Sequence, residues 1–222
     1  MNKSNKNKVK NKENTFFIDF VRITGLLPTL IWTRPKTIYI GDRKKSLLKK
    51  GVLIASNHIS FSDPIILYSV YWRRRIRFLA TKDLYKNKLI TFLFTAVGCI
   101  QLNKENVNMS FFHTVIDKLK LGNAVVIFPE GQVNQNDEML SFKQGAVLMS
   151  QLSGAPIQPV YITKRKKWYH RCVAIIGEPI DVRSMCSPFP NIDELSKIND
   201  YIHLKEQELE KYYIDNIKSK EK

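Results

Sequence analysis

His58 and Asp63 lie five positions apart in the segment NHISFSDP. The apolar run Val52–Ala55 just before them predicts a buried strand of a parallel sheet, so the histidine follows the carboxyl end of a strand. Ligands of open α/β sheets bind at that edge. Across a turn of this length the carboxylate can bind one ring nitrogen of the histidine, which leaves the other nitrogen as a general base. The pair therefore indicates proton-transfer chemistry.

A structural explanation of the same residues stays open when this segment is taken alone. Aspartate is a common N-cap residue and proline favours the first position of a helix, so Asp63 and Pro64 can simply begin a helix. A histidine in a loop needs no catalytic role. The rest of the chain has to decide between the two interpretations.

Three segments downstream each combine a short apolar strand with a polar or glycine-containing turn. They read GCIQLNK at 98–104, VVIFPEG at 125–131 and GAPIQPVYI at 154–162. Together with the histidine segment, in this order and at this spacing, they resemble the four sequence blocks of the glycerolipid acyltransferases, the family of the 1-acylglycerol-3-phosphate acyltransferases. The sequence FKQGA at 142–146 also resembles the Phe-Lys-x-Gly-Ala element of that family.

The resemblance implies an enzyme that moves a fatty acyl group from an acyl thioester to the free hydroxyl of lysophosphatidate and so makes phosphatidate. Acyl carrier protein or coenzyme A would carry the acyl group as a co-substrate, and neither a metal nor a bound cofactor is implied. His58 would take the proton of the hydroxyl while Asp63 orients the ring. A route through an acyl-serine at Ser60 or Ser62 is less favoured, because neither serine lies in a Gly-x-Ser-x-Gly turn.

Further residues are expected to bind the substrates: Lys104, Glu130, Gly131, Lys143 and Asn57. Lys104 ends the second block and would hold the anion of the acceptor or polarise the carbonyl. Glu130 is expected to be exposed by its turn, and Gly131 would let the main chain approach the acceptor. Lys143 would supply a second cation, and Asn57 would shape the turn before the histidine.

Two positions depart from the pattern of the family. Its third block usually reads Glu-Gly-Thr-Arg, whereas this chain has Val133 where the arginine would help to hold the acceptor phosphate. In the second block, Lys104 replaces the usual arginine and keeps the charge but loses the two-pronged geometry. The same reaction on another lysolipid is therefore an alternative. A third hypothesis is a basic membrane-binding protein without catalysis, which would need neither His58 nor Asp63.

The composition fits one catalytic domain. The 222 residues are 44% hydrophobic, which is enough for an independent core. Alternating patterns predict an α/β fold with a mostly parallel central sheet flanked by helices. Strands are expected near residues 37–41, 51–56, 76–80, 97–102, 124–128, 156–162 and 171–177. Helices are expected near 64–72, 107–121 and 143–152, and a long C-terminal helix begins at the Asn-x-x-Glu sequence of 191–194.

The formal net charge of +16 predicts an anionic partner, either a membrane surface or nucleic acid. Positive residues gather at 3–12, at 73–77 and at 164–167, and a tryptophan and a tyrosine follow the last run. These aromatic residues favour the headgroup level of a bilayer, and basic residues are attracted to anionic lipid. No nucleic-acid motif accompanies the basic runs, so we expect an anionic membrane surface and an acidic acyl carrier as partners.

An apolar segment, FFIDFVRITGLLPTLIW at 16–32, follows the basic arm. It is short for a membrane span and carries two charges, and no small-residue cleavage site of a signal peptide follows it. We expect a helix, which Pro28 can break, lying in or dipping into one leaflet; a core-packing helix is the alternative. Residues 1–35 would form this membrane-associating arm and residues 36–222 the catalytic domain, at the cytoplasmic face of the cell membrane.

Overall fold

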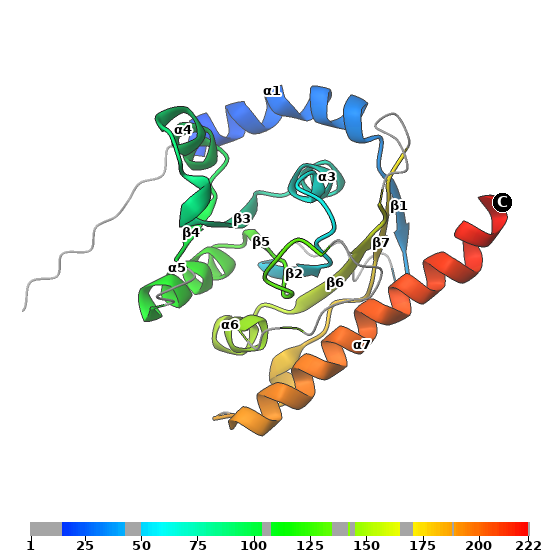
Figure 1. Cartoon of the computed structure of the whole chain (residues 1–222). Helices are drawn as coiled ribbons and strands as arrows, with labels where there is room; N and C mark the ends of the chain where they lie inside the picture. The colour runs from blue at the N-terminus through cyan, green and yellow to red at the C-terminus, as the bar shows by residue number, and fades with distance from the viewer. Residues whose placement is uncertain are drawn as a thin grey trace, which may run out of the picture.

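A seven-stranded sheet forms the centre of the computed structural model (Figure 1). The structure describes residues 15–42, 50–103, 108–134, 142, 145–164, 171–187 and 189–221. The strand order is β1-β7-β6-β2-β5-β3-β4, and every neighbouring pair is parallel except β6 with β7. The expected α/β fold with a mostly parallel sheet flanked by helices is confirmed.

The described elements follow the alternation that the sequence predicts. The strands are β1 (Lys36–Tyr39), β2 (Val52–Ser56), β3 (Ile76–Thr81), β4 (Ile100–Leu102), β5 (Ala124–Ile127), β6 (Ile157–Ile162) and β7 (Val173–Ile176). The α-helices are α1 (Thr15–Thr33), α3 (Asp63–Val70), α4 (Lys88–Ala96), α5 (Met109–Lys120), α6 (Gly145–Ser153) and α7 (Ile192–Asn216). Short 3-10 helices are η1 (Lys82–Leu84), η2 (Val182–Ser184) and η3 (Lys218–Glu221). All seven expected strands are present.

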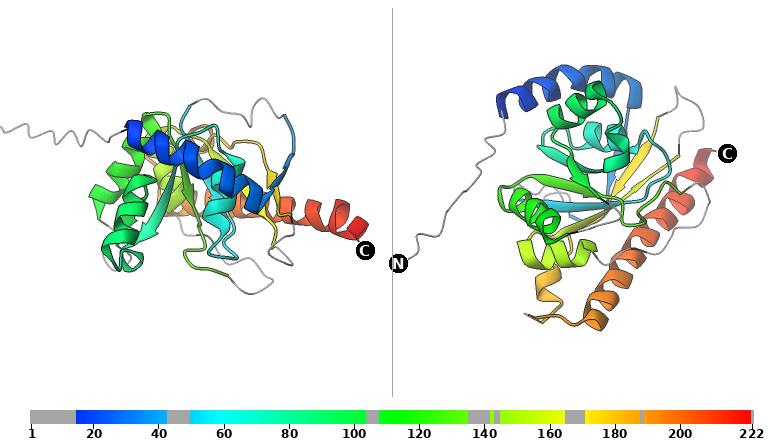
Figure 2. Two further views of the ribbon diagram at one scale, coloured as in Figure 1. Left: turned by 90° about the horizontal axis from the view of Figure 1, so that it is seen from above. Right: turned by 60° about the vertical axis from the view of Figure 1, so that its left-hand side comes forward.

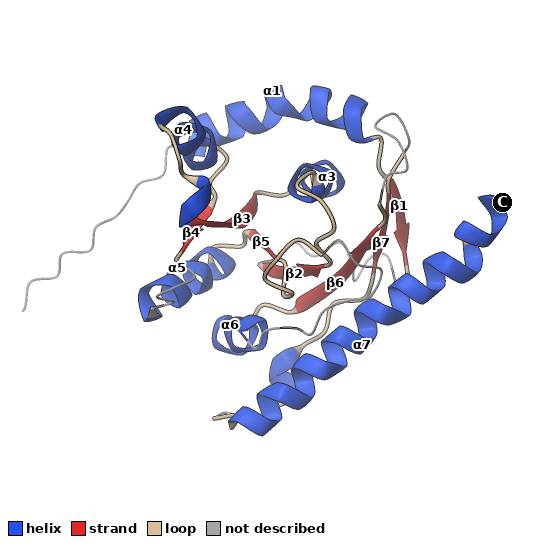
Figure 3. Ribbon diagram, viewed as in Figure 1, coloured by secondary structure: helices blue, strands red, loops and turns tan. Residues whose placement is uncertain are grey.

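Helices cover both faces of the sheet (Figure 3). On one face α1 crosses over α3 and touches α4, and on the other α5, α6 and α7 lie side by side. Figure 2 shows α1 as the outermost element of its layer. Alternate residues of β2 enter two separate cores, because Leu53 and Ala55 pack toward α5, α6 and α7 whereas Val52 and Ile54 pack toward α3. This burial on both faces explains the continuous apolar sequence of the strand.

One edge of the sheet gathers the ends of the strands that matter for the site. The strands β2, β3, β4, β5 and β6 all end there, because they run in the same direction. The strand β7 is antiparallel to β6, and β1 is parallel to β7, so these two begin at the same edge. We call it the His58 edge, because His58 follows the last residues of β2.

The N-terminal helix differs from the expectation in one respect. α1 continues through Pro28 and ends only at Thr33. A proline removes one backbone hydrogen bond and often kinks a helix, but it does not have to end it. Within the described part of the chain, no helix is long and apolar enough to cross a membrane.

The helix α4 was not predicted from the sequence. Its residues include many aromatic and β-branched side chains, which have low helix propensity and resemble a continuation of the strand expected near 97–102. Asn87 caps its first turn, since the side chain accepts a hydrogen bond of 2.8 Å from the amide of Ile90.

The C-terminal helix α7 begins as the sequence predicts. Asn191 and Glu194 form a complete capping box at its start. Ile198, Ile202 and Leu209 are buried and give the helix an apolar side. Ile192 is 72% exposed, because it lies in the first turn, before the helix reaches the core.

Candidate active site

His58 faces Asp63 across the turn between β2 and α3. The Nδ1 atom of the histidine lies 3.0 Å from the Oδ2 atom of the aspartate. The aspartate side chain is 1% exposed and the histidine side chain 16% exposed. An ionised carboxylate can only accept, so Nδ1 carries the proton and donates it, and Nε2 remains as a base. The structure thus brings together the two residues expected to do the chemistry.

The main chain of the turn fixes the position of the carboxylate. The Oδ2 atom of Asp63 also accepts hydrogen bonds from the amides of Ile59, at 2.7 Å, and Ser60, at 2.8 Å. Three donors therefore converge on one oxygen and hold it in line with the imidazole. The alternative role of Asp63 as an N-cap does not apply, since Ser62 occupies that position and its side chain makes no capping bond.

The third block holds His58 from the other side. The ring of Phe128 stacks on the imidazole, with centroids 4.0 Å apart and planes 17° apart. The amide of Asn134 donates a hydrogen bond of 2.6 Å to the carbonyl oxygen of His58. The amide of His58 donates a longer one, of 3.4 Å, to Oε1 of Glu130. Both the ring and the backbone of the histidine are therefore held by a loop about seventy positions away in the sequence.

Asn57 links β2 to its neighbour β6. Its Nδ2 donates to the carbonyl of Ile162 at 2.9 Å, and its Oδ1 accepts from the amide of the same residue at 2.8 Å. The side chain is 2% exposed. This arrangement agrees with the expected role of Asn57 in shaping the turn. Because the side-chain amide is buried and bonded to the main chain, the geometry favours a structural role over contact with a substrate.

Glu130 differs from the expectation of an exposed turn residue. It is 5% exposed, and a second carboxyl group, that of Glu206 from α7, is 0% exposed nearby. Burial raises the pKa of Glu206 well above its usual value, and the charge of Glu130 raises it further, whereas the main chain of Asn57 acts in the opposite direction. Neither carboxyl oxygen of Glu206 has a hydrogen-bond partner in the described structure. Burial and the charge of Glu130 thus favour the neutral form of Glu206, beneath the turn that carries His58.

The roles of Phe128 and Glu206 were not predicted from the sequence. The aromatic ring was visible in the third block, but its stacking on His58 depends on the pairing of β2 with β5. Glu206 was unremarkable among the charged residues of the last helix. Its only signal is its position on the apolar side of α7, since it follows Ile202 by four residues and precedes Leu209 by three.

The expected acceptor-binding residues are only partly described. Lys104 and Lys143 lie outside the described residues. The strand β4 ends at Leu102, three strands from β2, which is about 14 Å at the usual strand spacing. Gly131 has a φ of 74°, a left-handed conformation that suits glycine. Val133 is half-buried in the same loop, two residues later.

The basic run at 73–77 has a more structural role than expected. Arg77 is 2% exposed and donates to an asparagine side chain and a backbone carbonyl. Arg75 forms an ion pair of 2.7 Å with Asp19 of α1. Arg74 donates to two backbone carbonyls. These contacts tie the start of β3 and the loop before it to their neighbours, so three arginines of the run are engaged within the fold.

The geometry suits proton transfer without a covalent intermediate on the protein. His58 offers a base whose tautomer is fixed, beside a partly exposed surface at the His58 edge. Ser60 and Ser62 hydrogen-bond each other at 3.1 Å, and the described structure contains no hydrogen bond from either hydroxyl to the imidazole. No cluster of His, Cys, Asp and Glu suited to a metal ion occurs among the described residues.

Comparison with known proteins places this geometry in a family. The chain is 28% identical over 165 residues to the 1-acyl-sn-glycerol-3-phosphate acyltransferase of Bacillus subtilis, covering 72% of this chain and 81% of that protein. It is 24% identical over 203 residues to the enzyme of the same name from Streptococcus pneumoniae, covering 88% of this chain and 71% of that protein.

The fold is also similar to a solved structure. The crystal structure of the 1-acyl-sn-glycerophosphate acyltransferase PlsC from Thermotoga maritima matches with a TM-score of 0.64 at 20% identity, covering 89% of this chain and 80% of that chain. The family model Acyltransferase matches residues 35–163, which is more than half of the chain and includes His58, Asp63 and Glu130. The protein therefore belongs to the acyltransferase family.

Proposed function

We propose that this protein is a lysophosphatidate acyltransferase of phospholipid synthesis. It moves a fatty acyl group from an acyl thioester to the free hydroxyl of lysophosphatidate and releases phosphatidate and a thiol. The observation that carries the proposal is the His58–Asp63 pair at the carboxyl end of β2, within the segment that the family model matches. The names of the similar enzymes support lysophosphatidate as the acceptor.

The chemistry follows from the fixed tautomer of His58. Nε2 takes the proton of the acceptor hydroxyl while the oxygen attacks the thioester carbonyl, so that a carbon–oxygen bond forms. When the tetrahedral intermediate collapses, the carbon–sulfur bond breaks and the proton on the imidazolium passes to the leaving thiolate. Asp63 stays ionised, keeps the ring oriented and stabilises the imidazolium. Phe128 fixes the plane of the ring by stacking.

The acyl donor is a thioester of acyl carrier protein or of coenzyme A. Both carriers are acidic, and the chain has a formal net charge of +16. We propose that Lys104 and Lys143 supply the positive charges that bind the acceptor. Gly131 lets the main chain approach it closely. Val133 favours a weaker phosphate site than an arginine would form, so a lysolipid without a free phosphate is the second candidate acceptor.

A product analysis separates the two acceptors. Purified protein would be incubated with an acyl-carrier-protein thioester and, in turn, with lysophosphatidate and with lysophosphatidylcholine and lysophosphatidylethanolamine. We expect phosphatidate to form fastest. Lys104→Ala should lower kcat/KM for lysophosphatidate by about tenfold or more, the loss of one charge-assisted contact, and Val133→Arg should maintain or raise it. Faster acylation of a zwitterionic lysolipid would instead select the second candidate.

We also infer that the protein works at the surface of a membrane, on its cytoplasmic side. An exposed apolar stripe runs along α1 at the spacing of helical turns, and consists of Phe20, Ile23, Leu27 and Ile31. The neighbouring α4 exposes Leu89, Phe92 and Leu93. Contiguous exposed apolar surface of this kind marks a partner or a membrane. A bilayer is the partner that holds the lipid substrates, so we propose that α1 and α4 lie in its interface.

A further inference from the structure

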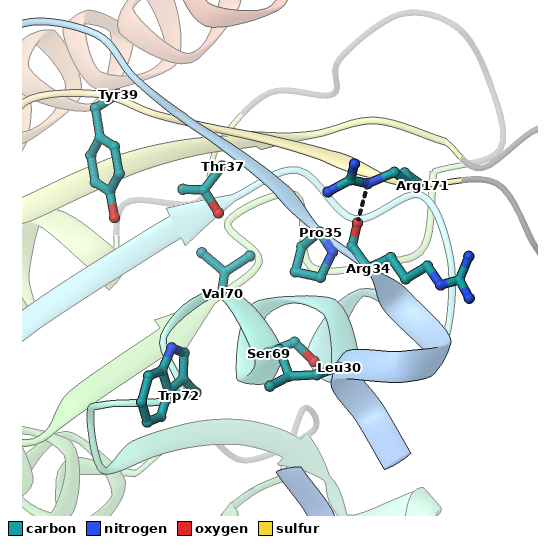
Figure 4. A pocket seen from close by; sticks show the side chains of 9 residues that line it. All are labelled: Leu30, Arg34, Pro35, Thr37, Tyr39, Ser69, Val70, Trp72 and Arg171. Carbon is teal, nitrogen blue, oxygen red and sulfur yellow. Dashed lines mark hydrogen bonds between the residues drawn. The ribbon is translucent and has the colours of Figure 1, made fainter. Parts of the chain in front are cut away.

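A pocket lies between the end of α1, the start of β1 and the last turn of α3. It has a volume of about 610 Å³, which is in the range of small-molecule sites. Figure 4 shows that its two ends differ. Arg34 and Arg171 lie at one end, and the aromatic side chains of Tyr39 and Trp72 lie at the other. Leu30, Pro35, Thr37, Ser69 and Val70 complete the lining.

The two arginines provide positive charge without a carboxylate in the pocket lining. Both residues are exposed, and none of the lining residues is acidic. The Nε of Arg171 donates a hydrogen bond of 3.2 Å to the carbonyl of Arg34, which holds the start of β7 against the end of α1. Guanidinium groups bind phosphate through several N–H donors, and the hydroxyl of Thr37 lies in the same lining.

The arginine end of the pocket lies at the His58 edge but away from the catalytic pair. Arg34 and Arg171 come just before the first residues of β1 and β7, which begin at that edge. The strand β1 is three strands from β2, about 14 Å at the usual spacing. It also lies on the opposite side of β2 from β4, the strand before Lys104, so a phosphate bound here is separate from the acceptor phosphate that Lys104 is proposed to hold.

The pocket also adjoins the apolar stripe of α1. Leu30 lines the pocket, and the next residue, Ile31, is 66% exposed as part of that stripe. Trp72 lines the opposite end and is 42% exposed. Tryptophan and arginine are both favoured at the headgroup level of a bilayer. When α1 lies in the interface, a lipid can enter the pocket from the side without leaving the bilayer.

We propose that this pocket binds the phosphate headgroup of an anionic phospholipid and so holds the protein on the bilayer with its His58 edge near the substrates. The phosphate meets Arg34 and Arg171, and the glycerol and upper acyl chain lie along Pro35, Val70 and Trp72. The proposal rests on the membrane association inferred above, but not on the identity of the acceptor or on the catalytic role of His58.

The test uses a charge-conserving substitution. The full chain with Arg34→Lys and Arg171→Lys keeps its net charge and loses the multidentate guanidinium contacts. The matched control is Arg73→Lys, because Arg73 is exposed beside Trp72 and outside the pocket lining, and a lysine can also lie over that ring. Sedimentation with phosphatidylcholine vesicles, with and without phosphatidate, measures binding of each variant.

We expect the double variant to bind phosphatidate vesicles about tenfold more weakly than wild type, while the control binds them as wild type does. Binding to pure phosphatidylcholine vesicles should be equal for all three proteins. Equal binding of the double variant and wild type to phosphatidate vesicles would overturn the proposal, because general surface charge would then explain the attraction. An equal loss of phosphatidate-vesicle binding in the Arg73→Lys control would also overturn the proposal.

Two further measurements identify the ligand and its site. Inorganic phosphate should compete only weakly with phosphatidate vesicles, because it makes none of the apolar contacts; competition at the affinity of the lipid would assign the pocket to soluble phosphate. Turnover on a short-chain, soluble lysophosphatidate should be unchanged in the double variant. A large rise in KM for that substrate would place the arginines in the acceptor site and contradict the proposal. Absence of turnover in wild type would refute the proposed function alone.

Discussion

Among single residues, Asp63 has the strongest influence on His58, the proposed base, and acts through one carboxylate oxygen. It accepts from two backbone amides and from Nδ1 of His58. Asparagine can offer an oxygen at this position but carries no negative charge, so it holds the Nδ1–H tautomer less firmly and does not stabilise the imidazolium. Asp63→Asn should lower turnover by about two to four orders of magnitude, as in triads of the same geometry.

The measurement for Asp63→Asn is the initial rate of phosphatidate formation, with the far-ultraviolet circular dichroism spectrum as the control for folding. Turnover close to that of wild type in folded protein would mean that the carboxylate only organises the turn. The KM for the acceptor should change little, because Asp63 is buried and does not reach the substrate.

Phe128 supplies the second constraint on the ring. Its stacking at 4.0 Å limits rotation of the imidazole, and aromatic pairs contribute about 0.5–1.5 kcal/mol. Phe128→Ala should therefore lower kcat by up to about tenfold and leave the acceptor KM unchanged. Phe128→Tyr, which keeps the ring, is the matched control and should retain activity. A kcat unaffected by the alanine substitution would show that the hydrogen bond to Asp63 alone is sufficient.

Among the helices, α7 places a buried carboxyl group, that of Glu206, under the turn that carries His58. The pKa of Glu206 in the folded protein is raised above its ordinary value of 4.5 by burial and by Glu130. Above pH 4.5 the unfolded chain loses this proton while the folded protein keeps it, so the group lowers stability increasingly as pH rises. Below both pKa values the proton is bound in both states and the effect disappears.

Glu206→Gln removes this titration while it keeps the shape of the side chain. Urea unfolding should give a higher midpoint for the variant than for wild type at about pH 8, and the difference should shrink at about pH 4. The matched control is Phe128→Tyr, which leaves the buried carboxyl group intact. Its urea midpoint should differ from that of wild type by the same amount at both pH values. A difference that is the same at both pH values would mean that folding does not raise the pKa of Glu206.

The helix α1 should act through its exposed stripe. Leu27 and Ile31 are 68% and 66% exposed, so replacing both with aspartate costs little folding energy and places charge in the proposed bilayer interface. Vesicle sedimentation should decrease strongly. The matched control is Ile192→Asp with Leu204→Asp on α7, which are 72% and 50% exposed on the opposite layer. An equal loss of vesicle binding in the two double variants would show that α1 has no special role in membrane binding.

At the scale of the whole molecule, the sequence predicted the parts that local chemistry determines. The strand β2 is buried on both faces and reads as one apolar run, and His58 and Asp63 are near neighbours in the chain. The stacking of Phe128 and the burial of Glu206 depend on contacts between residues about 70 to 150 positions apart, which no local pattern contains. The helix α4 was missed because its aromatic and β-branched residues resemble a strand.

The charge of the whole chain was also only partly interpretable from the sequence. Three of the arginines at 73–77 are occupied by contacts inside the fold. Arg34 and Arg171 lie outside the three basic runs of the sequence, yet the sheet topology brings them to one pocket. A basic cluster in space therefore need not be a basic cluster in the sequence.

For the whole enzyme, we propose that His58, held by Asp63, is the base that takes the hydroxyl proton of lysophosphatidate during acyl transfer. The most direct test compares phosphatidate formation by purified wild type and His58→Ala, each with an acyl thioester and lysophosphatidate. We expect wild type to form phosphatidate and the folded variant to lose at least about three orders of magnitude in rate, because alanine removes the base that takes the proton of the acceptor hydroxyl. Phosphatidate formation at a comparable rate by folded His58→Ala protein would show that His58 is not the base.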